Sequence, residues 1–120
     1  MKYIYDNKVK SLGVSVDEFK EAGMFILFGD NAPDTLKDFC YCIDIIPING
    51  EIKAGQKAII DGNEFIITSV GDVVMKNLRD LGHVTFTFDG STEPELPGTI
   101  YVESKPVPSL CVGSTIQIVE

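Results

Sequence analysis

Short apolar runs separated by turn-forming residues dominate the chain and predict a protein built mainly of β-strands. Period-two alternation, or an unbroken apolar run bounded by glycine, proline, aspartate or asparagine, is typical of strands. We expect strands over residues 3–9, 24–28, 39–46, 57–60, 64–70, 83–88, 99–103 and 114–119. Between two of them, Asp61-Gly62-Asn63 predicts a tight hairpin, because these residues accept a positive φ at little cost.

Three short helices are expected between the strands. Residues 15–23 begin with a serine followed three residues later by a glutamate, which is the spacing of a capping box. Residues 31–34 place proline and aspartate where the first turn of a second helix would lie. A third helix is expected over residues 71–81, with Gly82 as the left-handed residue that ends it. Many short strands with few helices favour an all-β protein, a small closed or nearly closed β-barrel.

The strand over residues 83–88 separates a core face from an outer face. Its even-numbered positions are valine and phenylalanine, and its odd-numbered positions are histidine and threonine. Successive side chains of a strand point to opposite faces, so His83 and Thr85 are expected on the outer face. The unbroken apolar run 24–28 is expected to be buried on both sides. The expected core contains Phe25, Leu27, Val84, Phe86 and Phe88.

Length and composition indicate one globular domain. The chain has 120 residues, of which 44% are hydrophobic and 23% charged, enough for an apolar core without disulfides or metals. We find no repeat or linker and expect residues 1–120 to form a single domain. No apolar stretch approaches the ~20 residues needed to span a bilayer, and the start is too polar for a signal peptide. A cytoplasmic location is therefore expected.

The charge balance narrows the range of partners. Ten basic side chains against eighteen acidic ones give a formal net charge of −8. Nucleic acid is disfavoured as a partner because phosphate backbones require clustered lysine and arginine. An anionic membrane surface is disfavoured for the same reason.

His83 is the only histidine in the chain, so any histidine chemistry must use it. The sequence contains no nucleotide-binding glycine loop, no zinc-protease motif and no nucleophile elbow. The histidine is expected just beyond a helix end, at the head of a strand and beside threonine hydroxyls. A neutral imidazole there could act as a nucleophile, with Thr85 and backbone N–H groups binding a transferred phosphoryl group. The spacing alone favours the alternative, a surface or capping histidine that interacts with the preceding helix end, because a single histidine on a polar face is common.

The cysteines offer a weaker alternative to histidine chemistry, namely a metal site. Cys40 and Cys42 share one face of a strand, and together with Cys111 and His83 they make a Cys₃His zinc site conceivable. The spacing matches no zinc finger or ribbon, so we interpret the cysteines as small buried side chains with free thiols. The acidic residues are scattered in turns and are interpreted as solvated loop carboxylates, not a catalytic pair.

The stretch from Gly71 to Gly98, which contains NLRDLGHVTFTFDG and then ELPG, resembles the glucitol/sorbitol-specific IIA components of the bacterial phosphotransferase system. Further matches are Ile4-Tyr5, the segment from Phe28 through Ala32-Pro33, Phe39-Cys40, the segment from Gly50 or Glu51 to Gly55, and Gly113-Ser114. The resemblance implies a cytoplasmic all-β barrel that takes a phosphoryl group from the carrier HPr onto a histidine. It also implies transfer to the IIB part of a sugar permease, the IIB and IIC subunits as partners, contact with the membrane only through that permease, and no cofactor.

One position departs from the family pattern. The phosphorylated histidine of the family usually lies in the strand that here spans Phe39 to Asp44, and ungapped alignment places Ile43 at that position. An alkyl side chain cannot accept phosphate. Either His83, which matches a family histidine within LGHVT, is the acceptor, or the chain is a degenerate paralogue that acts as a regulatory or protein-interaction module.

If His83 is the acceptor, its neighbours are expected to assist it. The mechanism would be in-line attack of a neutral imidazole nitrogen on phospho-HPr, which requires positioning and modest charge stabilisation but no metal. Thr85 is the candidate for a hydrogen bond to the phosphoryl group, and Asp80 or Asp89 for orienting the ring.

Overall fold

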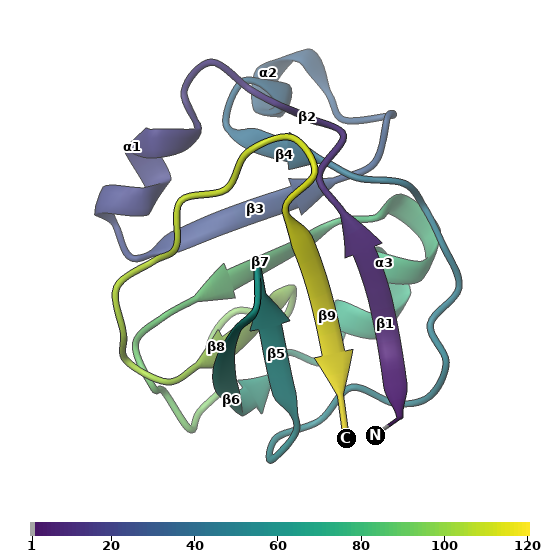
Figure 1. Ribbon diagram of the computed structural model, residues 1–120, viewed down its shortest axis with the longest axis vertical. Helices are drawn as coiled ribbons and strands as arrows, with labels where there is room; N and C mark the ends of the chain where they lie inside the picture. Colours follow the sequence, from purple (N-terminus) through teal and green to yellow (C-terminus); the bar gives the residue numbers. More distant parts are fainter. Residues whose placement is uncertain (1) are drawn as a thin grey trace.

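The computed structural model describes residues 2–120, which form nine strands and three short helices (Figure 1). The strands are β1 (Tyr3–Lys8), β2 (Ser11–Leu12), β3 (Met24–Phe28), β4 (Cys40–Cys42), β5 (Lys57–Ile60), β6 (Asn63–Val70), β7 (Val84–Thr87), β8 (Thr99–Val102) and β9 (Thr115–Val119). The helices are α1 (Val16–Glu21), α2 (Asp34–Lys37) and α3 (Val74–Leu81). None of the helices in the described residues is long and apolar enough to cross a membrane.

The strands form one sheet that curls into a nearly closed barrel, in the order β1-β9-β5-β6-β8-β7-β3-β4-β2 (Figure 1). The two edge strands, β1 and β2, are consecutive in the chain. Strand β1 pairs with β9 at one edge of the sheet, whereas β2 pairs with β4 at the other. Two backbone hydrogen bonds continue this pairing through the bend: Val9 N–H donates to Ser114 O and Lys10 N–H to Cys42 O. The all-β barrel expected from the sequence is confirmed.

The predicted core is also confirmed. The following side chains are each at most 5% exposed: Phe25, Leu27, Val84, Phe86 and Phe88. The ring of Phe25 stacks on that of Phe86, with centroids 5.1 Å apart. Each such side chain contributes roughly 1.5–3 kcal/mol when fully buried. On β3, however, Met24 and Ile26 are only half-buried on the outer face, so this strand is not buried on both sides as its apolar run suggested.

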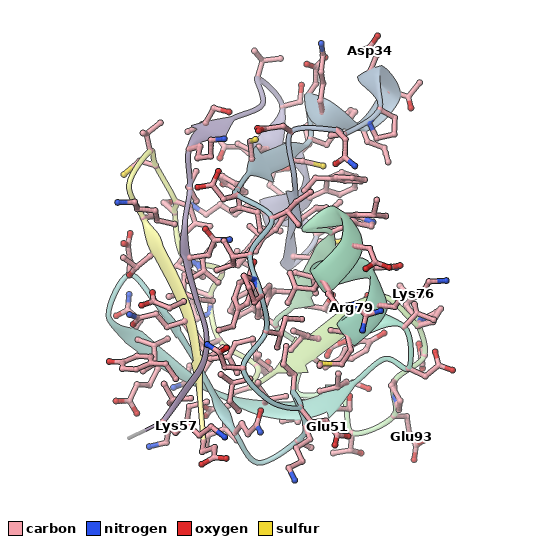
Figure 2. The ribbon with its side chains drawn as sticks, turned by 90° about the vertical axis from the view of Figure 1, so that its right-hand side faces the viewer. Asp34, Glu51, Lys57, Lys76, Arg79 and Glu93 are labelled. Carbon is pink, nitrogen blue, oxygen red and sulfur yellow. The ribbon has the colours of Figure 1, made fainter. Side chains whose placement is uncertain are left out.

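The segment after β4 departs most from the sequence prediction. The strand expected over residues 39–46 ends at Cys42, and the chain then runs beside the edge of β1 without joining the sheet (Figure 2). Asn49 N–H donates to Ile4 O at 2.7 Å, and the Asn7 side-chain amide donates to Asp44 O at 2.8 Å. The first bond satisfies a carbonyl of β1 that would otherwise be unpaired at a sheet edge, and the second satisfies the carbonyl of Asp44.

Helix α3 ends where the sequence predicts but begins three residues later, at Val74, and α1 ends at Glu21, before the predicted residue 23. Gly82 ends α3 in the left-handed conformation, with φ of 66°, as expected. Ser15 precedes α1, but its side chain makes no capping hydrogen bond. The capping box expected from the spacing of Ser15 and Glu18 is therefore not formed.

Candidate functional site

His83 lies between the end of α3 and the start of β7. The N–H of Gly82 donates to Leu78 O at 3.0 Å, and the N–H of His83 donates to Asn77 O at 3.2 Å. A Cβ atom at position 82 would lie 3.1 Å from the backbone nitrogen of Gly29. Glycine at 82 therefore meets two requirements together, a positive φ and a close approach to the end of β3. This turn brings the imidazole beside the last residues of β3.

The imidazole is held by one hydrogen bond and one aromatic contact. Its Nδ1 lies 3.2 Å from the backbone oxygen of Leu27, and its ring stacks on Phe28 with centroids 4.2 Å apart and planes 24° apart. A carbonyl oxygen can only accept, so Nδ1 carries the hydrogen and Nε2 of the neutral ring keeps its lone pair. Among residues 2–120 no hydrogen bond is found to Nε2. The half-buried ring thus presents one nucleophilic nitrogen in a fixed orientation.

His83, Phe28 and Cys42 form a row across three strands. Phe28 is opposite Cys42 in the parallel pairing of β3 with β4. In the antiparallel pairing of β3 with β7, Leu27 is opposite Val84, so the next residues along, Phe28 and His83, face each other. Side chains opposite each other in register lie on the same face of a sheet. The row therefore occupies the outer face of the barrel, as the alternation predicted for His83.

Thr85 lies on the same outer face, one row further along the sheet. It is opposite Ile26 in the register, and its N–H donates to Gly98 O at 3.2 Å. Alternate residues of a strand are about 6.6–6.8 Å apart, so the half-buried Thr85 is a near neighbour of the imidazole but not a direct partner. Its contact with a phosphoryl group stays a prediction.

The prediction that Asp80 or Asp89 orients the imidazole is wrong. Asp80 pairs with Arg79, whose Nε lies 3.1 Å from Asp80 Oδ1. Asp89 accepts the N–H of Ser91 at 2.9 Å. The orienting acceptor is instead the backbone carbonyl of Leu27, which every residue type carries and which a sequence pattern cannot single out.

Ile43 points into the barrel core. Its side chain is 0% exposed and belongs to the central apolar cluster, and its N–H donates to Phe28 O at 2.9 Å. Because neighbouring residues of an extended chain point to opposite faces, Cys42 is turned outward and Ile43 inward. The position at which the family resemblance expects the phosphorylated histidine is thus an inward, apolar one.

A cavity of about 300 Å³ adjoins the other side of Phe28. Cys42 lines it and donates its thiol hydrogen to Asp30 Oδ1 at 3.1 Å. Lys10 Nζ lies 3.1 Å from an Asp30 oxygen and 3.0 Å from Asp44 Oδ1. The Cys42 hydrogen bond and the Lys10 ammonium lower the pKa of Asp30, while Asp44 and then Asp30 raise the pKa of Lys10. The carboxylate of Asp30, which lines the cavity, thus shares one ammonium with the carboxylate of Asp44.

The three cysteines occupy different environments. Cys40 is buried as expected, but Cys42 is half-buried and Cys111 is exposed, so the interpretation of all three as buried side chains is wrong for two of them. Within residues 2–120 no group of three or more histidine, cysteine, aspartate or glutamate side chains could hold a metal ion. In the described part of the chain, the Cys₃His alternative therefore has no site.

The thiols are expected to be alkylated in the order Cys111, Cys42, Cys40. Burial raises the pKa of Cys40 to about 11, and burial followed by the Asp30 hydrogen bond raises that of Cys42. The thiolate is the reactive form, so a raised pKa slows alkylation. Peptide mass spectrometry after iodoacetamide treatment at pH 8 measures the order. Asp30→Asn is expected to accelerate alkylation of Cys42 and to leave Cys111 unchanged, and equal rates at all three thiols would contradict the assignment.

Comparison with known proteins agrees with this architecture. The family model described as "PTS system glucitol/sorbitol-specific IIA component" matches residues 4–117. The chain is 34% identical over 118 residues to the PTS system glucitol/sorbitol-specific EIIA components of Shigella flexneri and Escherichia coli (strain K12), covering 98% of this chain and 95% of each relative. The crystal structure of the PTS system IIA component from Enterococcus faecalis V583 has the same fold, with a TM-score of 0.83 at 23% identity over 97% of this chain and 100% of that one. The chain therefore belongs to the glucitol/sorbitol-specific IIA component family of the phosphotransferase system.

Proposed function

We propose that this chain is the IIA phosphocarrier of a glucitol/sorbitol-type phosphoenolpyruvate-dependent phosphotransferase system. It accepts a phosphoryl group from phospho-HPr on His83 and passes it to the IIB subunit of a sugar permease. Residues 1–120 act as one domain in the cytoplasm, and the IIB and IIC subunits are its only link to the membrane. The observation that carries the proposal is the imidazole itself, with Nδ1 held by the Leu27 carbonyl and Nε2 unpaired among the described residues.

The proposed reaction is an in-line exchange between two histidine rings. The lone pair of His83 Nε2 attacks the phosphorus atom, the N–P bond of the donor breaks, and its electron pair returns to the donor ring. The hydrogen on Nδ1 stays in place, so the phosphorylated ring carries a positive charge. The Leu27 carbonyl oxygen and the face of Phe28 both stabilise that charge, the first through the hydrogen bond and the second through its negative π-face.

The second step reverses the first. A cysteine or histidine of the IIB subunit attacks the same phosphorus from the open side, and the electron pair of the N–P bond returns to His83 Nε2. The ring regains its neutral form without gaining or losing a proton, because Nδ1 keeps its hydrogen throughout. Thr85 is proposed to donate a hydrogen bond to the phosphoryl oxygens from the same face of β7.

A module that binds HPr or the permease without accepting phosphate is the second candidate. The observation that favours it is the buried alkyl side chain of Ile43 at the position where the family resemblance expects the acceptor. This candidate shares the fold and the partners of the first and differs only in the chemistry of His83.

Labelling from phosphoenolpyruvate distinguishes the two candidates. With enzyme I, HPr and radiolabelled phosphoenolpyruvate, the phosphocarrier is expected to gain one phosphate that is lost in acid and retained in base, because N–P bonds hydrolyse in acid. If the chain binds HPr but stays unlabelled, the phosphocarrier proposal fails and the binding module is supported.

A further inference from the structure

Beside the imidazole lies a large apolar side chain that the barrel does not bury. Ile45 is 46% exposed, although it follows a buried residue by only two positions. If Gly29 carried a Cβ atom, that atom would lie 2.8 Å from Ile45 Cγ1, and a Cβ atom on Gly82 would lie 3.4 Å from the same carbon. Ile45 therefore packs against two glycines, Gly29 and Gly82. Gly29 follows Phe28 and Gly82 precedes His83, so both adjoin the residues whose rings stack.

The backbone itself requires both glycines, because a Cβ atom on Gly29 would lie 2.7 Å from Leu81 O and Gly82 has a φ of 66°. An exposed isoleucine contributes little to stability, because its outer half stays in water. It does extend the exposed apolar surface beside the glycines that follow Phe28 and precede His83. Exposed apolar groups beside a reactive atom are typical of surfaces that bind another protein.

Charged groups border the same surface on one side. Asp44, directly before Ile45, has 58% of its side chain exposed, and Asp30, directly after Gly29, has 73%. A single ammonium, that of Lys10, lies between these two carboxylates, so the pair keeps a net negative charge. A partner with cationic groups around an apolar centre would complement this arrangement.

We propose that Ile45 is the apolar anchor of the surface on which the phosphoryl donor docks, with Asp30 and Asp44 as its acidic border. This inference rests on the proposed function, because the occupant it names is the protein that delivers phosphate to His83. The donor's contact face is apolar at its centre and carries lysine or arginine at its edge. Docking on this surface brings the phosphoryl group of the donor to His83.

Two phosphoryl donors of different size test the proposal. Phospho-HPr must dock before transfer, whereas phosphoramidate, a small molecule, needs only access to Nε2. Ile45→Ser is expected to lower kcat/KM for labelling by phospho-HPr about tenfold, the scale of an anchor residue, and to leave labelling by phosphoramidate unchanged. The matched control is Ile66→Ser on β6, because Ile66 is also 46% exposed and β6 carries no site residue. That control is expected to change labelling less than about twofold with either donor.

The charged border is tested by salt dependence. Lys10→Gln leaves both carboxylates without their ammonium and is expected to raise kcat/KM for phospho-HPr at low salt, whereas Asp44→Asn is expected to lower it. The rates of both variants should approach that of the wild type in 0.5 M salt, because exposed charges are then screened.

The outcomes separate the docking surface from the acceptor role. If Ile45→Ser slows phosphoramidate and phospho-HPr equally, Ile45 positions the ring and the docking proposal is overturned. Equal labelling of Ile45→Ser and wild type by phospho-HPr overturns it as well. If neither donor labels the wild type, the acceptor role of His83 fails, and titration with unphosphorylated HPr decides the surface. Weaker HPr binding by Ile45→Ser then supports the docking surface, and equal binding rejects it.

Discussion

Replacing His83 by glutamine is expected to abolish phosphate labelling of this protein by phospho-HPr. No other imidazole exists in the chain to form an acid-labile N–P bond. Glutamine is a polar side chain of similar length, but it has no nucleophilic ring nitrogen. The loss of the stacked contact with Phe28 costs about 0.5–1.5 kcal/mol, so the folded barrel should persist with Tm lowered by only a few degrees.

The matched control for this variant is Thr87→Val. Thr87 lies on β7 and on the same outer face as His83, two rows away from it, and has no proposed part in the transfer. Its labelling is expected to equal that of the wild type. Labelling is measured after native gel electrophoresis, and circular dichroism confirms that each variant is folded. An acid-labile phosphate on His83→Gln would contradict the assignment of the acceptor.

The fold followed from local patterns, which is why most of it could be predicted. Alternation over residues 83–88 identifies the core face of β7 because side chains of a strand must point alternately in and out. The turn between β5 and β6 is equally local, with φ of 51° at Asp61 and 83° at Gly62. The two-residue strand β2 escaped prediction, because its pairing with β4 depends on a barrel that closes only in three dimensions.

The contacts of the imidazole could not be predicted for the same reason. Leu27, which supplies the orienting carbonyl, lies 56 residues away from His83 in the chain. The stacking of Phe28 likewise depends on the register between β3 and β7, which no local pattern specifies. A carboxylate near in sequence was the natural expectation for a ring partner, but Asp80 and Asp89 are engaged by Arg79 and by the Ser91 N–H.

The buried position of Ile43 changes what a histidine there can do. Ile43→His would exchange a fully buried alkyl group for an imidazole with no partner of its own in the apolar cluster. Loss of apolar burial and the unpaired polar ring together cost about 3–5 kcal/mol, a large part of the total stability of roughly 5–15 kcal/mol for a domain. Ile43→Val, the control, removes one methylene group and should cost about 1 kcal/mol. Urea unfolding followed by circular dichroism measures both.

The stability of Ile43→His should also depend on pH in a way that only an inward side chain explains. A buried imidazole stays neutral, whereas in the unfolded chain it binds a proton below about pH 6.5. The unfolded state of Ile43→His then holds more protons than the folded state, so the stability of this variant should fall further below that of Ile43→Val as the pH drops from 8 to 5.5.

The inward ring is also out of reach of phospho-HPr, so the Ile43→His variant is expected to gain no second phosphate. If Ile43→His is as stable as the wild type at both pH values and carries two phosphates, residue 43 turns outward when it is histidine. The family acceptor position would then be open to HPr in this chain, and only the alkyl side chain would prevent its use.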